Sequence, residues 1–229
     1  MNYFIYASYA ALLLCIVMCF IHFFRLIKLG SPKDLSEKSG SVAAGVAYSN
    51  TKAMLPQHKE SAYKHLPTYT AGILFHLGSF LALLLFVLLI PDAVWGFFFQ
   101  YTIISLLIAL CLFVSTCCGA GLIIKRIVSK QLKPISNVDD YLSTGFVTFF
   151  QLFSALLFFS FAFHDVFHNF FSSNIHGGLI SIYFLSATLL FLYLPFGKLK
   201  HAVYYFAARY HLGFFYGRRG TWPPVETVR

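Results

Sequence analysis

The sequence predicts an all-α membrane protein with five transmembrane helices, and three observations support this fold class. The chain is 59% hydrophobic and only 11% charged, whereas soluble domains carry about 25% charged residues. Five windows have the length of about 20 apolar residues that a helix needs to cross a bilayer. Lys and Arg are found only after the first, third and fifth windows, so every second connection carries all of the positive charge. A soluble enzyme, a disordered chain and a disulfide scaffold are thereby excluded.

The five windows have helix length rather than the alternating pattern of barrel strands. The first has no basic residue before it and no small-residue cleavage site after it, so we expect it to be retained as a helix and not cleaved as a signal peptide. The expected spans are, in order, roughly 3–24, 69–90, 98–122, 142–163 and 177–196.

The distribution of positive charge predicts the orientation of these spans. Of the 17 Lys and Arg residues, seven fall in 25–68, four in 123–141 and six after position 196. Because positively charged loops remain in the cytoplasm, we expect the N-terminus outside and the C-terminus inside.

The cytoplasmic segments differ in their expected order. The stretch 36–52 is rich in Ser, Gly and Ala and predicts an irregular part of the long loop 25–68. The stretch 197–216 mixes Tyr, Phe and Ala with Lys and Arg, which indicates either a continuation of the fifth helix or an interfacial helix. We therefore expect one membrane domain over 1–216, followed by a flexible cytoplasmic tail over 217–229. No internal repeat is visible, which argues against a secondary transporter.

Histidines near the spans are the main functional candidates, because ionisable residues within membranes are costly. His76 stands in an otherwise apolar stretch of the second span. It either forms a hydrogen bond with a neighbouring helix or is an axial ligand of a b-type haem. Haem ligation requires a second histidine at similar depth. His201 is the first candidate and His22 the reserve.

Residues around these histidines leave further alternatives open. Lys198, Tyr205 and Arg209 share a helical face with His201, and this face is either plainly interfacial or able to hold haem propionates. The small-residue run 115–121 predicts close helix packing or room for a flat macrocycle. Gln151, inside the fourth span, indicates an interhelical hydrogen bond rather than a cofactor contact. The five cysteines form no C-x-x-C motif, so a zinc ribbon, a c-type haem and an iron–sulfur ligand set are not expected.

Several short motifs resemble one family of respiratory membrane subunits. They are Phe75-His76-Leu77-Gly78, the run from Gly121 through Lys125-Arg126, Asp139-Asp140 before the fourth span with Gln151 inside it, and Pro195-Phe196-Gly197-Lys198-Leu199-Lys200-His201. Over about the last two thirds of the chain the sequence resembles the cytochrome b (gamma) subunit of respiratory nitrate reductase. It equally resembles the related cytochrome b subunits of heterodisulfide reductase-type and sulfite-reduction-associated complexes. The resemblance implies haem b, quinone as substrate and a cytoplasmic iron–sulfur partner.

The family pattern has an inner and an outer pair of haem ligands. The resemblance assigns the inner pair to His76 and His201, whereas the outer pair falls on Phe86 and Tyr183, which implies one haem instead of two. Four outer residues remain unexplained, and they indicate a displaced second haem, a metal site, a site for quinol deprotonation or ordinary surface polarity. These four are His164, Asp165, His168 and His176.

We therefore expect an electron-transfer subunit of a quinone-linked oxidoreductase in the cytoplasmic membrane of a prokaryote, rather than a complete enzyme. It would pass electrons between the quinone pool and a cytoplasmic iron–sulfur or reductase partner. A heterodisulfide reductase-like protein is one candidate for this partner. The alternative is a non-redox membrane anchor or assembly subunit in which the histidines are structural. A nucleic-acid partner is not expected, since no soluble module carries a basic face.

Overall fold

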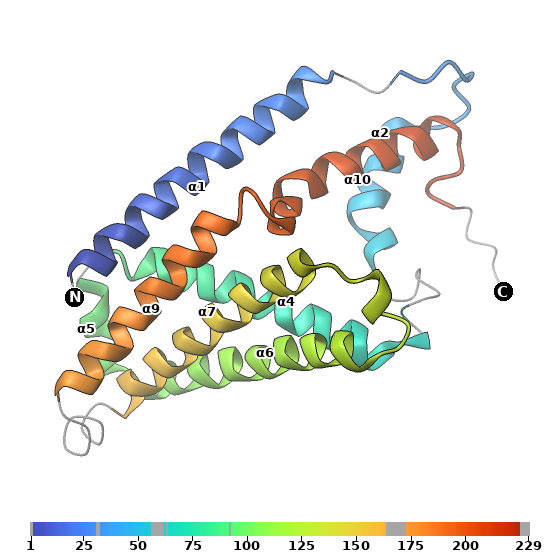
Figure 1. Ribbon diagram of the computed structural model, residues 1–229. Coiled ribbons are helices and arrows are strands. Elements are labelled where there is room, and N and C mark those ends of the chain that lie inside the picture. Colours follow the sequence, from blue (N-terminus) through green and yellow to red (C-terminus); the bar gives the residue numbers. More distant parts are fainter. Residues whose placement is uncertain are drawn as a thin grey trace. The chain divides into compact units, whose positions relative to one another are not determined.

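The computed structural model describes residues 2–30, 33–55, 62, 64–91, 93–163 and 173–224, and all regular structure within these ranges is helical (Figure 1). The chain divides into two compact units, each of which combines segments far apart in sequence. The first contains 1–15 and 67–198, and the second contains 16–66 and 199–229. Each unit is described by itself.

Long apolar helices account for most of the first unit. Four helices are long and apolar enough to cross a membrane, and a fifth span results when α9 and the helix beyond a break at 194–197 are counted as one broken span. The prediction of an all-helical chain with several helices able to cross a membrane is confirmed, and the predicted number of five spans is reached only if the broken pair counts as one. The helices of this unit are α1 (Asn2–Lys28, its first half), α4 (Leu66–Leu88), α5 (Ala93–Gln100), α6 (Thr102–Val128), α7 (Val138–Ala162) and α9 (Ser173–Tyr193).

The third predicted span differs from the structure at its beginning. The sequence predicts one helix over 98–122, but the structure has the short helix α5 and a separate α6, divided at Tyr101, whose backbone leaves the helical region. The Ser105 hydroxyl donates a hydrogen bond of 2.7 Å to the Phe98 carbonyl across this break. The Trp95 indole N–H donates to the Leu89 carbonyl at 2.8 Å. These side chains satisfy carbonyl groups that the interrupted helices leave exposed.

The interior of the first unit is built from aromatic rings, while its outer surface is also apolar. Phe86 of α4 lies 5.0 Å from Phe191 and 6.1 Å from Tyr183, ring centre to ring centre. Large side chains such as Phe80, which is 64% exposed, cover the outside of the helices. Water-soluble proteins do not expose extended apolar surfaces of this kind, so this surface suits contact with lipid.

The second unit depends on a close approach of two helices, α2 (Val42–Asn50) and α10 (His201–Arg218). A Cβ atom added at Gly213 would lie 2.5 Å from the Val46 Cα atom, and one at Gly45 would overlap the Gly213 carbonyl oxygen. At the other end of the contact, the Ser49 hydroxyl donates to the Arg209 carbonyl at 2.7 Å, and the Arg209 guanidinium donates in return to the Ser49 carbonyl. Glycines therefore bring the two backbones together.

This helix pair corrects the expectation of an irregular segment at 36–52, because residues 42–50 are helical and packed. It also decides between the two alternatives for 197–216. The chain breaks after α9, with the Gly197 N–H bonded to the Tyr193 carbonyl at 2.9 Å, and α10 begins as a new helix after the short turn η4 (Lys198–Lys200). Pro195 lies in this break, where a missing backbone N–H opposes a continuous helix.

The beginning of the expected tail is packed within the second unit. Arg218 donates two hydrogen bonds to the Ser36 carbonyl, and its own carbonyl accepts from the Ser39 and Gly40 N–H groups. The Trp222 ring lies 4.7 Å from that of Tyr216. Of the expected tail over 217–229, residues 225–229 fall outside the described residues.

A charged pair supports the same region. The Arg219 guanidinium lies 3.4 Å from an Asp34 carboxylate oxygen. Hydrogen bonds from Ser36, first from its backbone N–H, together with the nearby Arg219 and Arg218 charges, hold the pKa of Asp34 below its ordinary value. The carboxylate therefore stabilises the folded unit above its ordinary pKa, and this contribution is lost as the pH falls through the lowered value.

The glycine contact generates the first prediction, which compares one chemical change at two sites. Gly213→Ala inserts a methyl group against the Val46 backbone and should destabilise the second unit by about 1–3 kcal/mol. Gly145→Ala in α7, where an added Cβ meets no atom within 4 Å, should stabilise its helix by roughly 0.5–1 kcal/mol.

Unfolding in detergent, followed by Trp222 emission in a Trp95→Phe background, measures the first effect, because the chain has two tryptophans. Circular dichroism measures the second. Equal responses to the two substitutions would contradict the backbone contact.

Candidate functional site

His76 is held in one tautomer by its own helix. Its Nδ1 atom lies 2.7 Å from the Gly72 carbonyl oxygen, one turn earlier in α4. A carbonyl oxygen only accepts hydrogen bonds, so Nδ1 carries the proton and the neutral ring keeps its lone pair on Nε2. Metal-binding histidines commonly have this arrangement, in which one ring nitrogen is fixed by a hydrogen bond and the other coordinates.

The surroundings of His76 on α4 fit a ligand of a large flat group. The side chain is exposed, and a Cβ atom added at Gly72 would meet no atom within 4 Å. Apolar side chains on the exposed surface of the same helix, including Leu77 and Phe80, would favour an apolar macrocycle. The sequence left open a hydrogen bond from His76 to a neighbouring helix. Among the described residues, the His76 ring instead bonds to the Gly72 carbonyl of its own helix.

The peptide group immediately before His76 is bound from two other helices. The Phe75 carbonyl accepts a hydrogen bond from the Gln151 amide at 3.0 Å and from the Ser115 hydroxyl at 3.3 Å. The Gln151 amide also donates to the Ser79 hydroxyl at 2.8 Å. The prediction of an interhelical hydrogen bond for Gln151 is confirmed.

The small-residue run 115–121 serves helix packing at this point. A Cβ atom at Gly119 would lie 2.7 Å from the Phe75 ring and would overlap the Thr148 hydroxyl. Likewise, a Cβ atom at Gly78 would overlap the Ser115 side chain. The space beside Gly119 and Gly78 is filled by the protein itself, which favours close packing there, whereas a Cβ atom at Gly121 would meet no atom within 4 Å.

The expected second ligand belongs to the other unit. His201 is the first residue of α10 and is exposed. The reserve candidate, His22, lies in the same unit as His201, and its Nδ1 atom is 3.0 Å from the Tyr204 hydroxyl.

Two residues expected on a propionate-binding face have other partners. The Tyr205 hydroxyl contacts the Met54 sulfur at 2.9 Å, and Arg209 bonds to Ser49 of α2. Both side chains thus take part in the packing of α2 and its extension η1 (Lys52–Met54) against α10.

The positions that would hold an outer haem are filled by two rings in contact. Phe86 is 1% exposed and Tyr183 is fully buried, with 6.1 Å between their ring centres. Phe150 lies against Tyr183 at 5.7 Å in a stacked orientation. Together with Phe150, the two rings fill the space between α4, α7 and α9.

The remaining expected site residues cannot be placed as side chains. His164, Asp165 and His168 lie outside the described residues, and His176 is described only as backbone in the first turn of α9. Among the described residues there is no group of three or more His, Cys, Asp or Glu side chains that could hold a metal ion.

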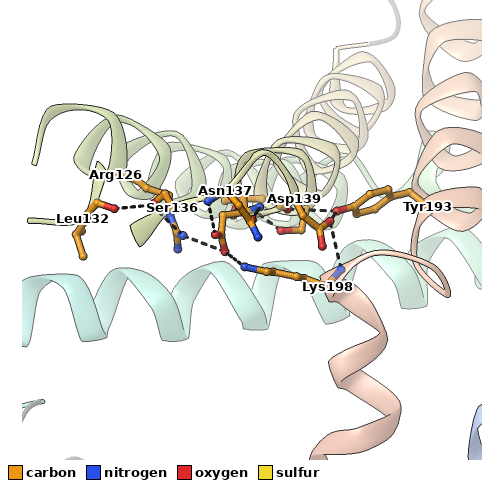
Figure 2. Close-up of polar contacts among 10 residues, drawn as sticks. Arg126, Leu132, Ser136, Asn137, Asp139, Tyr193 and Lys198 are labelled. Atoms are coloured by element: carbon orange, nitrogen blue, oxygen red, sulfur yellow. Dashed lines mark hydrogen bonds and ion pairs between the residues drawn. The ribbon is translucent and has the colours of Figure 1, made fainter. Parts of the chain in front are cut away.

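A charged cluster joins the ends of α6, α7 and α9 (Figure 2). Asp140 lies 3.0 Å from the Arg126 guanidinium and 2.7 Å from the Lys198 ammonium group. Its second carboxylate oxygen accepts from the Asn137 N–H, and Asn137 in turn accepts from the Asp140 N–H, which forms the capping box that begins α7. Asp139 accepts a hydrogen bond from the Tyr193 hydroxyl of α9.

Sequence reasoning identified these acidic residues by resemblance but did not predict their partners. It also missed Ser79 and Ser115 as partners of the α4 backbone. A signal for both was present, since Gly78 and Ser79 in α4 and Ser115 and Gly119 in α6 are small residues that permit a close helix approach.

No family model matches the chain, and no curated protein or solved structure is significantly similar to it. The case for a function thus depends on the residues and their geometry.

The charged cluster generates the second prediction. Asp140→Asn removes the charge that faces Arg126 and Lys198 but keeps an oxygen able to accept from the Asn137 N–H. We expect a loss of roughly 1–2 kcal/mol in unfolding free energy, and the wild-type advantage should shrink as salt is raised.

Thermal unfolding of both proteins at low and high ionic strength measures this difference. Lys130→Gln, a charge change on an exposed side chain nearby, is the control. An Asp140→Asn protein as stable as wild type at low salt would show that the cluster contributes nothing.

Proposed function

We propose that this protein is a haem b-containing membrane subunit that transfers electrons between the quinone pool and a cytoplasmic iron–sulfur or reductase partner. The observation that carries the proposal is the His76 ring, whose Nδ1–H is fixed by the Gly72 carbonyl while Nε2 keeps its lone pair on an exposed, apolar helix.

In this proposal His76 and His201 are the two axial ligands. The bound haem supplies one-electron transfer. The chain itself fixes the tautomer of His76 through Gly72, and α4 carries exposed apolar side chains beside it, including Leu77 and Phe80. The proposed orientation, with the N-terminus outside and the C-terminus in the cytoplasm of a prokaryote, follows from the positions of Lys and Arg.

The same proposal assigns one haem to the chain. Phe86 carries no atom able to coordinate iron, and the contact between Phe86 and Tyr183 leaves no haem-sized void between them. The outer residues His164, Asp165, His168 and His176 then belong to a quinol site or to the outer surface.

The cytoplasmic partner would bind through 25–68 and the basic C-terminal segment. The second unit contains 12 of the 17 Lys and Arg residues but only four of the 8 Asp and Glu residues, so it carries a net charge of +8 of the total +9. A surface of this sign attracts a partner with an acidic docking face. The charge by itself also suits the alternative function, a non-redox membrane anchor or assembly subunit, which requires no haem.

The third prediction separates the two functions. The purified protein should show the reduced-minus-oxidised spectrum of non-covalent haem b, and both His76→Ala and His201→Ala should abolish it, because each removes one axial ligand. His65→Ala, a change of an exposed histidine outside the site, should leave the spectrum unchanged.

Haem content per chain completes this test. A ratio near one supports the assignment. A ratio near two, with one haem lost on substitution of His164, His168 or His176, would contradict the single-haem proposal. A colourless protein would favour the anchor.

The fourth prediction concerns docking. Combined Lys33→Glu and Lys38→Glu substitutions, both at exposed positions of the second unit, should reduce recovery of a co-purifying iron–sulfur protein by roughly tenfold, because two attractive charges become repulsive. Lys130→Glu with Lys133→Glu, two exposed positions of the first unit, is the matched control. Equal losses in the two double variants would place the docking surface elsewhere.

A further inference from the structure

The peptide group that links Phe75 to His76 is the most heavily bonded point of α4. Its carbonyl oxygen accepts from Gln151 of α7 at 3.0 Å and Ser115 of α6 at 3.3 Å, as well as from the Ser79 hydroxyl at 2.7 Å. Side chains from two other helices therefore hold the group that is covalently attached to the His76 Cα atom.

Burial makes this connection difficult to rearrange. Gln151 is fully buried, Ser115 is 1% exposed, and Gly78 leaves the space in which Ser115 lies against the α4 backbone. Water is not available there to replace a lost hydrogen bond, so the position of the Phe75 carbonyl is fixed by these donors.

The amide of Gln151 is used asymmetrically. Its nitrogen donates to both Phe75 and Ser79, whereas its oxygen is buried without a hydrogen-bond partner among the described residues. An unpaired buried acceptor costs about 1–3 kcal/mol. Simple packing of α7 against α4 would be achieved at lower cost by an apolar side chain of the same volume.

Two sets of contacts thus act on His76 from different directions. The Gly72 carbonyl fixes the orientation of the ring within its helix, and Gln151 fixes the backbone from which the ring projects. Displacement of this peptide group would move Nε2 with it.

We infer that Gln151 is a positioning residue for His76, which sets the placement of the Nε2 atom toward haem iron through the Phe75 carbonyl. This inference rests on the proposed haem function and extends it to a residue that does not touch the haem ligand itself. Partners that bond directly to a ligating side chain alter metal affinity by about 10- to 100-fold when removed, so an indirect contact such as Gln151 should act at the lower end of this range.

The test compares three single variants of the full chain in detergent. Gln151→Met keeps the length of the side chain and removes both donors. Gln151→Glu is neutral when buried and retains one O–H donor. Ser154→Ala is the control, since Ser154 is buried one turn away on α7 and donates only to its own helix, to the Phe150 carbonyl.

Each protein is titrated with haem, and its midpoint potential and the electron paramagnetic resonance signal of the oxidised form are recorded. Gln151→Met should bind haem about tenfold more weakly, with a shifted potential and an altered low-spin signal. Gln151→Glu should restore these properties in part, and Ser154→Ala should match wild type. A purely structural role would lower thermal stability without changing the potential or the signal of the haem that remains.

The outcomes separate the two levels of the argument. Wild-type protein that binds no haem overturns the proposed function and this inference together. Wild-type protein with haem and a Gln151→Met variant of identical affinity, potential and signal overturns only the role of Gln151. Equal changes in Gln151→Met and Ser154→Ala would assign the effect to general packing and overturn the inference as well.

Discussion

A polar group in an apolar environment must find its partner within the chain, and most of the described structure follows from this constraint. The Phe75 carbonyl illustrates it, since Gln151 and Ser115 direct their donors to one backbone oxygen of α4. Those bonds require the helices to approach closely, which in turn requires Gly78 and Gly119. Small residues and buried donors therefore act together, because the glycines permit the close approach that the interhelical hydrogen bonds need.

The second unit also combines glycines at a close helix contact with side-chain hydrogen bonds to backbone carbonyls. Gly45 and Gly213 bring α2 and α10 together, and the reciprocal bonds of Ser49 and Arg209 satisfy backbone carbonyls at one end of the contact. This unit contains most of the net charge of the chain, and it also exposes apolar side chains such as Phe206. Similar close backbone contacts thus hold helices together in both units.

The features predictable from sequence were those that depend on composition averaged over a helix. Apolar windows located the long helices within a few residues, and the isolated position of Gln151 indicated its interhelical bond. The helix α2 was missed because it has only nine residues, which include the poor helix former Gly, and its stability comes from contact with α10, more than 150 positions away. The partners of Arg209 and Tyr205 were missed for the same reason, because they lie on α2 and η1, about 150 positions away in the sequence.

Phe86 and Tyr183 show how contact geometry adds to an argument from resemblance. Sequence alone shows that two expected ligands are absent, and two unrelated substitutions would give the same observation. The structure places the two rings 6.1 Å apart in a packed layer with Phe150, so each ring occupies volume that the other would otherwise leave open. A change at one position would create a cavity or a clash unless the other position changed with it. Phe86 and Tyr183 therefore depend on each other for their packing, and this layer of the bundle is a single packed unit with Phe150.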